Sequence, residues 1–187
     1  MNTTTADINF HELCEKLRSM KLSSMADTLE KQLANPNSGL QSFDERISEI
    51  ICSEWDTRYN KKFNRFLKKA TLKYPAADID ESIYDADRFL DTGTIERLAA
   101  CDWIDEGKNL LITGSTGSGK TYISNALCIS ALRLFHTVRY VKASTLIYEL
   151  EQAQVTGEYL NYTKKLAALD LLVIDDFGLM ELDIDKC

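Results

Sequence analysis

The sequence lacks the features that mark membrane and secreted proteins. None of its apolar runs approaches the roughly 18–20 residues that a membrane-spanning helix requires. The first residues, MNTTTADINF, carry neither the basic flank nor the apolar core of a signal peptide. These absences favour a cytoplasmic protein without a membrane partner.

Cysteine and histidine are also sparse, and their spacing excludes the common metal-binding patterns. The five cysteines form no C-x-x-C pair, and the chain has only two histidines. We therefore expect free thiols in a reducing compartment. By contrast, apolar residues make up 44% of the 187 residues, which is enough for a packed core in one or two domains.

The negative net charge is unevenly distributed along the chain. Residues 57–77 contain seven basic residues and no acidic one, which leaves −14 for the rest of the chain, since the total is −7. Such asymmetry concerns binding partners rather than fold. The seven are Arg58, Lys61, Lys62, Arg65, Lys68, Lys69 and Lys73. We predict that they contact the DNA backbone without reading base sequence, while the interleaved aromatic residues pack inside.

The first 74 residues have the pattern of a small helical domain. Apolar residues recur at helical spacing in Phe10, Leu13, Leu17 and Met20, and a second helix follows with Ser24 as its expected N-cap. The turn cluster NPNSG at 35–39 should end that helix. Ser42 and Glu45 form a capping box, which opens a long helix expected at about 43–74 with Ile47, Ile50, Ile51 and then Trp55 inward.

An acidic stretch separates this domain from a region of alternating elements. We expect domain boundaries at 1–74, 75–104 and 105–187, with the middle segment acting as an acidic connector that includes a short helix at 95–104. The last segment alternates between strand and helix, which is typical of a parallel sheet with crossover helices. Its expected strands are 109–113, 137–142 and 169–176, and its expected helices are 119–135, 144–153 and 158–169.

The stretch GSTGSGKT matches the phosphate-binding pattern G-x-x-x-x-G-K-(S/T). Its glycines let the backbone curl so that several N–H groups point at one anion, and the following helix adds the positive end of its dipole. Lys120 is expected to contact the β- and γ-phosphates, and the Thr121 hydroxyl to bind Mg²⁺. We assign phosphate binding to Gly114, Ser115, Thr116, Gly117, Ser118, Gly119, Lys120 and Thr121.

A second motif, an apolar strand followed by two acidic residues, supports the same kind of site as this loop. The apolar run 171–174 is typical of a buried parallel strand, and Asp175 and Asp176 follow it, at the strand end where such sheets place ligands. We assign Asp175 to the metal ion and Asp176 to activation of the attacking water. The second acid favours an ATPase over a small-molecule kinase. The third glycine of the G-x-G-x-x-G loop is missing, which argues against a dehydrogenase.

The whole pattern resembles the IstB-like ATPases, which are helper proteins of insertion-sequence transposition and relatives of the DnaC helicase loaders. The resemblance is carried by a helical N-terminal segment and by CDWIDEGKNLLITGSTGSGKTYISNAL, VRYVKASTLIYEL and LDLLVIDDFGL. It implies an α/β AAA+ P-loop NTPase domain after a small all-α domain. It also implies ATP and Mg²⁺ as cofactors, Lys120 and Asp176 as catalytic residues, homo-oligomeric assembly, DNA binding and a transposase partner.

The sequence departs from the family pattern at its end, eleven residues after Asp176. The family continues with two more strands, a sensor residue and an arginine finger, so the resemblance implies a C-terminally incomplete domain with weak hydrolysis. It places one absent strand between the phosphate-loop strand and the 171–174 strand, whose edges would then be unpaired. Two other functions remain open: a helicase loader that contacts a replicative helicase, and a nucleotide-binding module without turnover.

Overall fold

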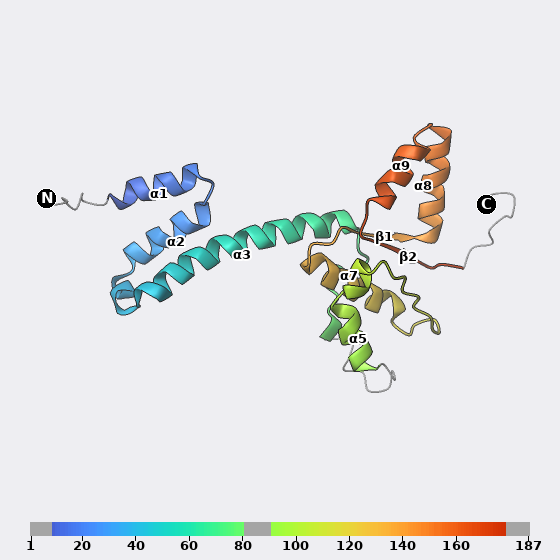
Figure 1. Ribbon diagram of the computed structural model, residues 1–187, viewed down its shortest axis with the longest axis horizontal. Coiled ribbons are helices and arrows are strands. Elements are labelled where there is room, and N and C mark those ends of the chain that lie inside the picture. Colours follow the sequence, from blue (N-terminus) through green and yellow to red (C-terminus); the bar gives the residue numbers. More distant parts are fainter. Residues whose placement is uncertain (1–8, 81–90, 179–187) are drawn as a thin grey trace. The chain divides into compact units, whose positions relative to one another are not determined.

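The computed structural model describes residues 9–80 and 91–178 (Figure 1). Its contacts divide the chain into two compact units, Met1–Lys62 and Phe63–Cys187, which are described separately below. The expected boundaries after residues 74 and 104 stay predictions, and residues 81–90 of the expected connector lie outside the described ranges. None of the described helices combines the length and apolar content that a membrane span requires.

The N-terminal unit is helical, as the sequence predicts. Helices α1 (Phe10–Ser19) and α2 (Ser23–Ala34) are followed by a 3₁₀ turn, η1 (Pro36–Leu40), and by the first part of α3 (Phe43–Ala70). The turn therefore ends α2 where the NPNSG cluster predicts. The Arg18 guanidinium on α1 bridges to Glu30 at 2.8 Å and Asp27 at 3.1 Å on α2, so charge pairs help to hold the two helices together.

The N-terminus of α2 is capped differently from the sequence prediction. Ser24 is not the N-cap: that position is Leu22, whose side chain makes no capping bond. Instead the Glu54 carboxylate on α3 accepts hydrogen bonds from the backbone N–H groups of Ser24 at 2.9 Å and Met25 at 3.4 Å. A carboxylate satisfies the orphan donors and the dipole of a helix start as a local cap does. The prediction was wrong because the cap comes from 30 residues away.

Helix α3 begins as predicted and ends slightly earlier. The Ser42 N–H donates to the Glu45 carboxylate at 2.8 Å and the Glu45 N–H donates to the Ser42 hydroxyl at 3.3 Å, which confirms the capping box. The helix ends at Ala70 because Thr71 has a left-handed φ of +54°. The expected inward face was right at Ile50, which is buried, and wrong at three other positions, because the exposed side chains include Ile47, Ile51 and Trp55.

The C-terminal unit holds the phosphate loop and its helix. Helices α5 (Thr92–Ala99) and α6 (Asp102–Asp105) replace the single helix expected at 95–104, because Cys101 between them takes a left-handed φ of +66°. Helix α7 (Lys120–Arg133) follows the loop, as predicted. It buries eight of its fourteen residues and therefore forms the centre of this unit.

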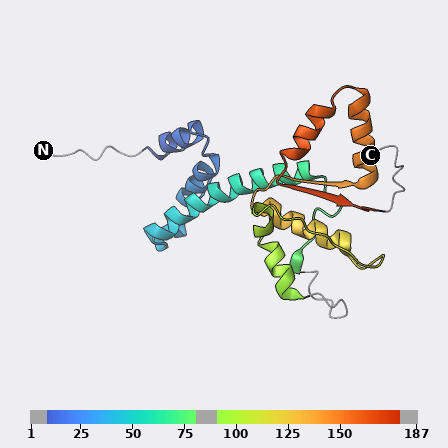
Figure 2. The same cartoon turned by 45° about the vertical axis from the view of Figure 1, so that its right-hand side comes forward.

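A parallel pair of strands confirms the α/β class. Strand β1 (Val138–Lys142) pairs with β2 (Leu171–Asp175), so that Tyr140 lies opposite Val173 and Lys142 opposite Asp175. Helices α8 (Ala143–Val155) and α9 (Tyr159–Ala167) form the crossover connection between the two strands. In both views these helices cover one face of the strands, and α7 covers the other (Figures 1 and 2).

The expected strand at 109–113 is not a strand in this structure. The described sheet contains β1 and β2 alone, and 109–113 has no strand beside it to supply backbone hydrogen bonds. Leu111 in this segment is 79% exposed. Strand β2 is likewise half-buried at all five positions rather than buried, because only one of its edges is paired within the described residues.

The core of the C-terminal unit lies between α7, the strands and the end of α3. Buried residues from these elements form one cluster, with Phe63 and Phe66 of α3 packed against it. This confirms that aromatic side chains of the basic stretch pack inside. The cluster includes the thiols of Cys101 and Cys128, and burial raises the pKa of Cys101 to about 11 and of Cys128 to about 12. Both thiols are therefore protonated and unreactive at neutral pH.

Candidate nucleotide-binding site

The loop 114–121 has the backbone geometry that its glycines predict. Gly117 and Gly119 have left-handed φ values of +81° and +86°, which residues with a side chain rarely adopt. A Cβ atom on Gly114 would lie 3.0 Å from the Ser118 hydroxyl oxygen. Gly119 is the N-cap of α7, so the free N–H groups and positive dipole end of this helix lie at the loop.

The Lys120 ammonium group lies inside the curl of the loop. Its Nζ donates to the backbone oxygens of Gly114 at 2.9 Å and Ser115 at 2.7 Å. Both of these acceptors are neutral carbonyl groups, and neither is a carboxylate. An incoming phosphate group would offer this ammonium a stronger, charge-assisted hydrogen bond.

The loop and the acidic strand meet at one point, although they are 54 residues apart in sequence. The Thr121 hydroxyl donates to both carboxylate oxygens of Asp175, at 3.3 Å to Oδ1 and 3.1 Å to Oδ2. Thr121 is in the first turn of α7, and Asp175 is the last residue of β2. A hydroxyl and a carboxylate oxygen are the hard ligands that Mg²⁺ prefers, so these two side chains fit such an ion.

The surroundings of Asp175 keep its carboxylate ionised. Burial raises the pKa of this group, but hydrogen bonds from Tyr140, the Asp176 backbone N–H and Thr121 outweigh burial, and the net pKa lies below its ordinary value. The positive charge of Lys73 acts in the same direction. The group therefore carries the negative charge that a metal ligand needs at neutral pH.

Asp176 has a different environment from its neighbour. It takes a left-handed φ of +56°, which aspartate tolerates better than most residues, and so leaves the strand direction. Its carboxylate forms an ion pair with Lys142 Nζ at 3.2 Å, and both side chains are about half exposed. Asp176 is thus the more accessible of the two acids, and its pairing with Lys142 is screened by water.

Two polar residues that sequence reasoning missed complete the site. Tyr140 on β1 donates its hydroxyl proton to Asp175 Oδ2. Asn125 on α7 is fully buried and donates to the Thr121 carbonyl oxygen at 2.7 Å. A lone amide among the apolar residues of the loop helix is a sequence feature that could have identified Asn125. Burial and the bond to Asp175 raise the pKa of Tyr140, so its hydroxyl remains a donor.

The segment after α3 is tied to the same elements. The Thr71 hydroxyl donates to the Tyr140 carbonyl oxygen at 2.8 Å, and the Tyr74 N–H donates to Asn125 Oδ1 at 3.1 Å. The Asp78 N–H donates to the Tyr122 hydroxyl at 3.1 Å. Hydrogen bonds therefore connect the segment after α3 to β1 once and to the loop helix α7 twice.

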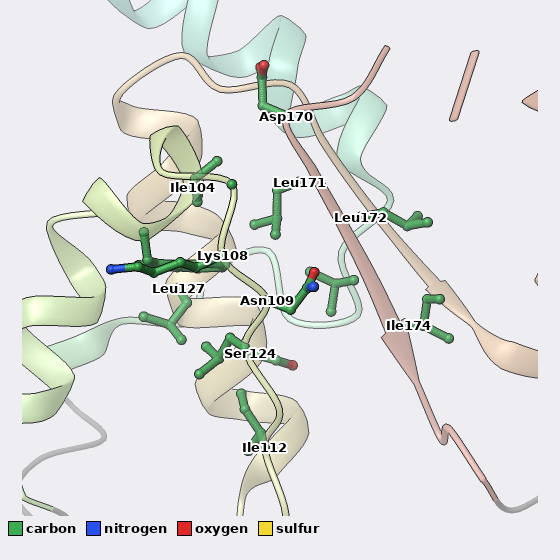
Figure 3. Close-up of a pocket in the computed structure, with 14 residues that line it drawn as sticks. Ile104, Lys108, Asn109, Ile112, Ser124, Leu127, Asp170, Leu171, Leu172 and Ile174 are labelled. Atoms are coloured by element: carbon green, nitrogen blue, oxygen red, sulfur yellow. The ribbon is translucent and has the colours of Figure 1, made fainter. Parts of the chain in front are cut away.

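A cavity of about 430 Å³ lies beside this site rather than at the phosphate loop. It separates the unpaired segment around Asn109 from β2, and its lining includes Ile112, Leu127 and Leu171 (Figure 3). It contains neither Thr121 nor Asp175. Its lining is mostly apolar but also includes polar side chains, among them Lys108, Asn109 and Ser124.

The seven basic residues of the proposed DNA-binding stretch are all exposed, and six of them lie on α3. Arg58 is partly engaged within the N-terminal unit, because it donates to Glu54 at 2.7 Å and to the Lys21 carbonyl oxygen at 2.8 Å. Lys73 follows the helix and stacks over the Tyr74 ring at 5.4 Å. Arg65 likewise lies over the Phe66 ring, with its guanidinium carbon 5.6 Å from the ring centroid.

Comparison with known proteins identifies the family. A sequence model of the family described as "IstB-like ATP binding protein" matches residues 15–187, which is nearly the whole chain. The chain belongs to this family. This confirms the resemblance and the assignment of the α/β region to the P-loop class.

Individual members are similar over most of their length. The chain is 36% identical to a Pseudomonas fluorescens protein named as a candidate ATP-binding protein of insertion sequence IS1162, over 90% of the chain and 73% of that protein. It is 34% identical to the similarly named y4uH of Sinorhizobium fredii, over 92% of the chain and 69% of the relative. A Mycobacterium tuberculosis protein with such a name is 29% identical, over 88% and 65%.

Proposed function

We propose that this IstB-like protein is an ATPase subunit that binds Mg²⁺ and ATP at the loop 114–121, binds DNA, and assists the transposase of an insertion sequence. One observation carries the nucleotide site: the Thr121 hydroxyl lies 3.1 Å from the Asp175 carboxylate, next to a glycine loop that encloses Lys120. The names of the relatives support the insertion-sequence role.

The chain's own groups would act as follows. Loop N–H groups and Lys120 would bind the phosphates, while Thr121 and Asp175 would hold the metal ion, which neutralises phosphate charge when bound. Asp176 is the more exposed acid and would orient the attacking water once it leaves its pairing with Lys142. Turnover on this proposal requires an exchange of partners at Asp176, whereas binding does not.

Exposed residues support DNA binding and self-association. Arg65, Lys68 and Lys69 are exposed on α3, with the apolar side of the helix packed in the core. Earlier on the same helix, Phe43 and Trp55 are exposed by 76% and 71%, and large exposed aromatic side chains are common at interaction surfaces. We propose that the three basic residues contact phosphates and that the two aromatic residues form contacts between subunits.

Replacement of Lys120 by alanine tests nucleotide binding. A charge-assisted hydrogen bond contributes about 1.5–3 kcal/mol, so Lys120→Ala should weaken ATP binding in Mg²⁺ by about 10- to 150-fold, measured by titration calorimetry. Lys164→Ala removes an exposed lysine from α9 and should leave the affinity unchanged. Equal affinities of the wild type and Lys120→Ala would remove the basis of the proposal. Phosphate release with and without DNA then separates an ATPase from a binding module, since the latter shows no turnover.

Paired lysines on two helices test DNA binding. Lys68 and Lys69 lie in the last turn of α3, and Lys164 and Lys165 lie in the last turn of α9. Changing the first pair to glutamine should weaken DNA binding and reduce the salt slope by about 0.7–0.9 for each lost phosphate contact. The same change at Lys164 and Lys165 is the charge-matched control. A filter-binding titration in which both double variants keep the wild-type slope would contradict the assignment.

A further inference from the structure

Three neutral donors hold the carboxylate of Asp175: the Asp176 backbone N–H and two side chains from different elements. Thr121 approaches it from α7, and Tyr140 donates to its Oδ2 from β1. In the parallel register Tyr140 lies opposite Val173, which is two residues before Asp175 on β2. Residues two apart on a strand share a face, so Tyr140 and Asp175 lie on the same face of the sheet. The tyrosine hydroxyl therefore reaches the carboxylate diagonally across two paired strands.

Tyr140 is itself fixed in place. The residue is buried, with 6% of its surface exposed. Its backbone oxygen accepts a hydrogen bond from the Thr71 hydroxyl at 2.8 Å. A phenol hydroxyl that is buried without a partner is costly, and here the hydroxyl donates to the one carboxylate that the metal proposal uses, with the Asn125 side chain as a further hydrogen-bond partner. Phenylalanine would fill the same volume without that bond, so packing alone does not account for a tyrosine at this position.

We propose that Tyr140 is a positioning residue for the metal-binding carboxylate. Its hydroxyl donates to Oδ2 and so helps to fix the rotation of the Asp175 side chain, which would hold the carboxylate beside Thr121, where these two side chains would bind the metal ion. This inference rests on the proposed function. It assigns to β1 a role in metal binding in addition to the roles of the phosphate loop and β2.

The test compares ATP affinity in Mg²⁺ with ATP affinity in EDTA, using the full chain and calorimetry. The ratio of the two affinities is the magnesium gain. Tyr140→Phe should lower this gain by about tenfold, the value of one hydrogen bond to a charged group, and leave the affinity in EDTA unchanged. Tyr148→Phe makes the same change at a side chain that is 60% exposed on α8, and should leave both affinities unchanged.

Other outcomes overturn the inference in distinguishable ways. Equal losses in Mg²⁺ and in EDTA would show that Tyr140 is merely structural, and a larger gain in Tyr140→Phe would show that the tyrosine blocks the metal. An unchanged gain would show that the hydroxyl has no role. If the wild type has no magnesium gain, the proposed metal site fails, and this inference fails with it.

A second arm uses Asp175→Asn as the background. If Tyr140 acts through the carboxylate, adding Tyr140→Phe to Asp175→Asn should not reduce the magnesium gain further. An additional loss in the double variant would show that Tyr140 acts by another route and would overturn the proposal. Thermal melts of all variants, compared with the wild type, report whether each is folded at the temperature of the titration.

Discussion

Helix α7 buries eight of its fourteen residues, whereas α1 buries one of its ten. The C-terminal unit has a core of aliphatic and thiol side chains around α7, and this packing sets where Thr121 lies relative to Asp175. The N-terminal unit instead relies on charge pairs and caps, with Arg18 and Glu54 as their centres. Precise positioning of the proposed site thus coincides with tight packing.

The sharpest test of this contrast is a matched pair of truncations. Leu132 on α7 is fully buried, and Ile51 on α3 is 53% exposed. Leu132→Ala should lower the free energy of unfolding by about 2–5 kcal/mol, since it leaves a cavity. Ile51→Ala should change it by less than about 0.5 kcal/mol. Urea unfolding of the full chain measures both values, and similar losses in the two variants would refute the difference in packing.

A smaller effect is expected at Glu54 in the N-terminal unit. Burial raises the pKa of this carboxylate, but hydrogen bonds from Arg58 and from the N–H groups of Met25 and Ser24 lower the net pKa below its ordinary value of 4.5. A lowered folded-state pKa contributes stability above the ordinary pKa, and this contribution is lost as the pH falls through the folded-state pKa.

The corresponding variant is Glu54→Gln. At pH 7 it should be less stable than the wild type by about 1–2 kcal/mol, because it loses an ionised helix cap and the pair with Arg58. The difference should shrink as the pH falls from 4.5 through the lowered folded-state pKa, since the wild-type carboxylate in the folded protein is protonated only below that pKa. Urea unfolding at both pH values checks this, and a difference that grows in acid has the wrong sign for this account.

Local patterns predicted the elements whose signals lie within a few residues. The Ser42–Glu45 capping box, the turn at 35–39 and the two strands with β-branched or apolar runs are all present in the structure. The approach of the loop to the acidic strand also follows from sequence, because parallel strands place their carboxyl ends at one edge. These predictions needed no knowledge of tertiary contacts.

Features that depend on distant partners were missed. The cap of α2 comes from Glu54, and the segment 109–113 has a strand pattern but no neighbouring strand in the described sheet. Tyr140 and Asn125 gain their roles only when β1 and α7 lie against each other. The exposure of Trp55 on an amphipathic helix likewise could not be read from spacing, because periodicity shows which residues share a face and not what covers it.

The most direct test of the central claim is whether Thr121 and Asp175 act through a single metal ion. A double-mutant cycle with Thr121→Val and Asp175→Asn, read as the ratio of ATP affinities in Mg²⁺ and EDTA, measures their coupling. The account predicts that each variant alone loses most of the magnesium gain and that the double variant loses little more. Independent, additive losses, or an Asp175→Asn variant with the full gain, would contradict it.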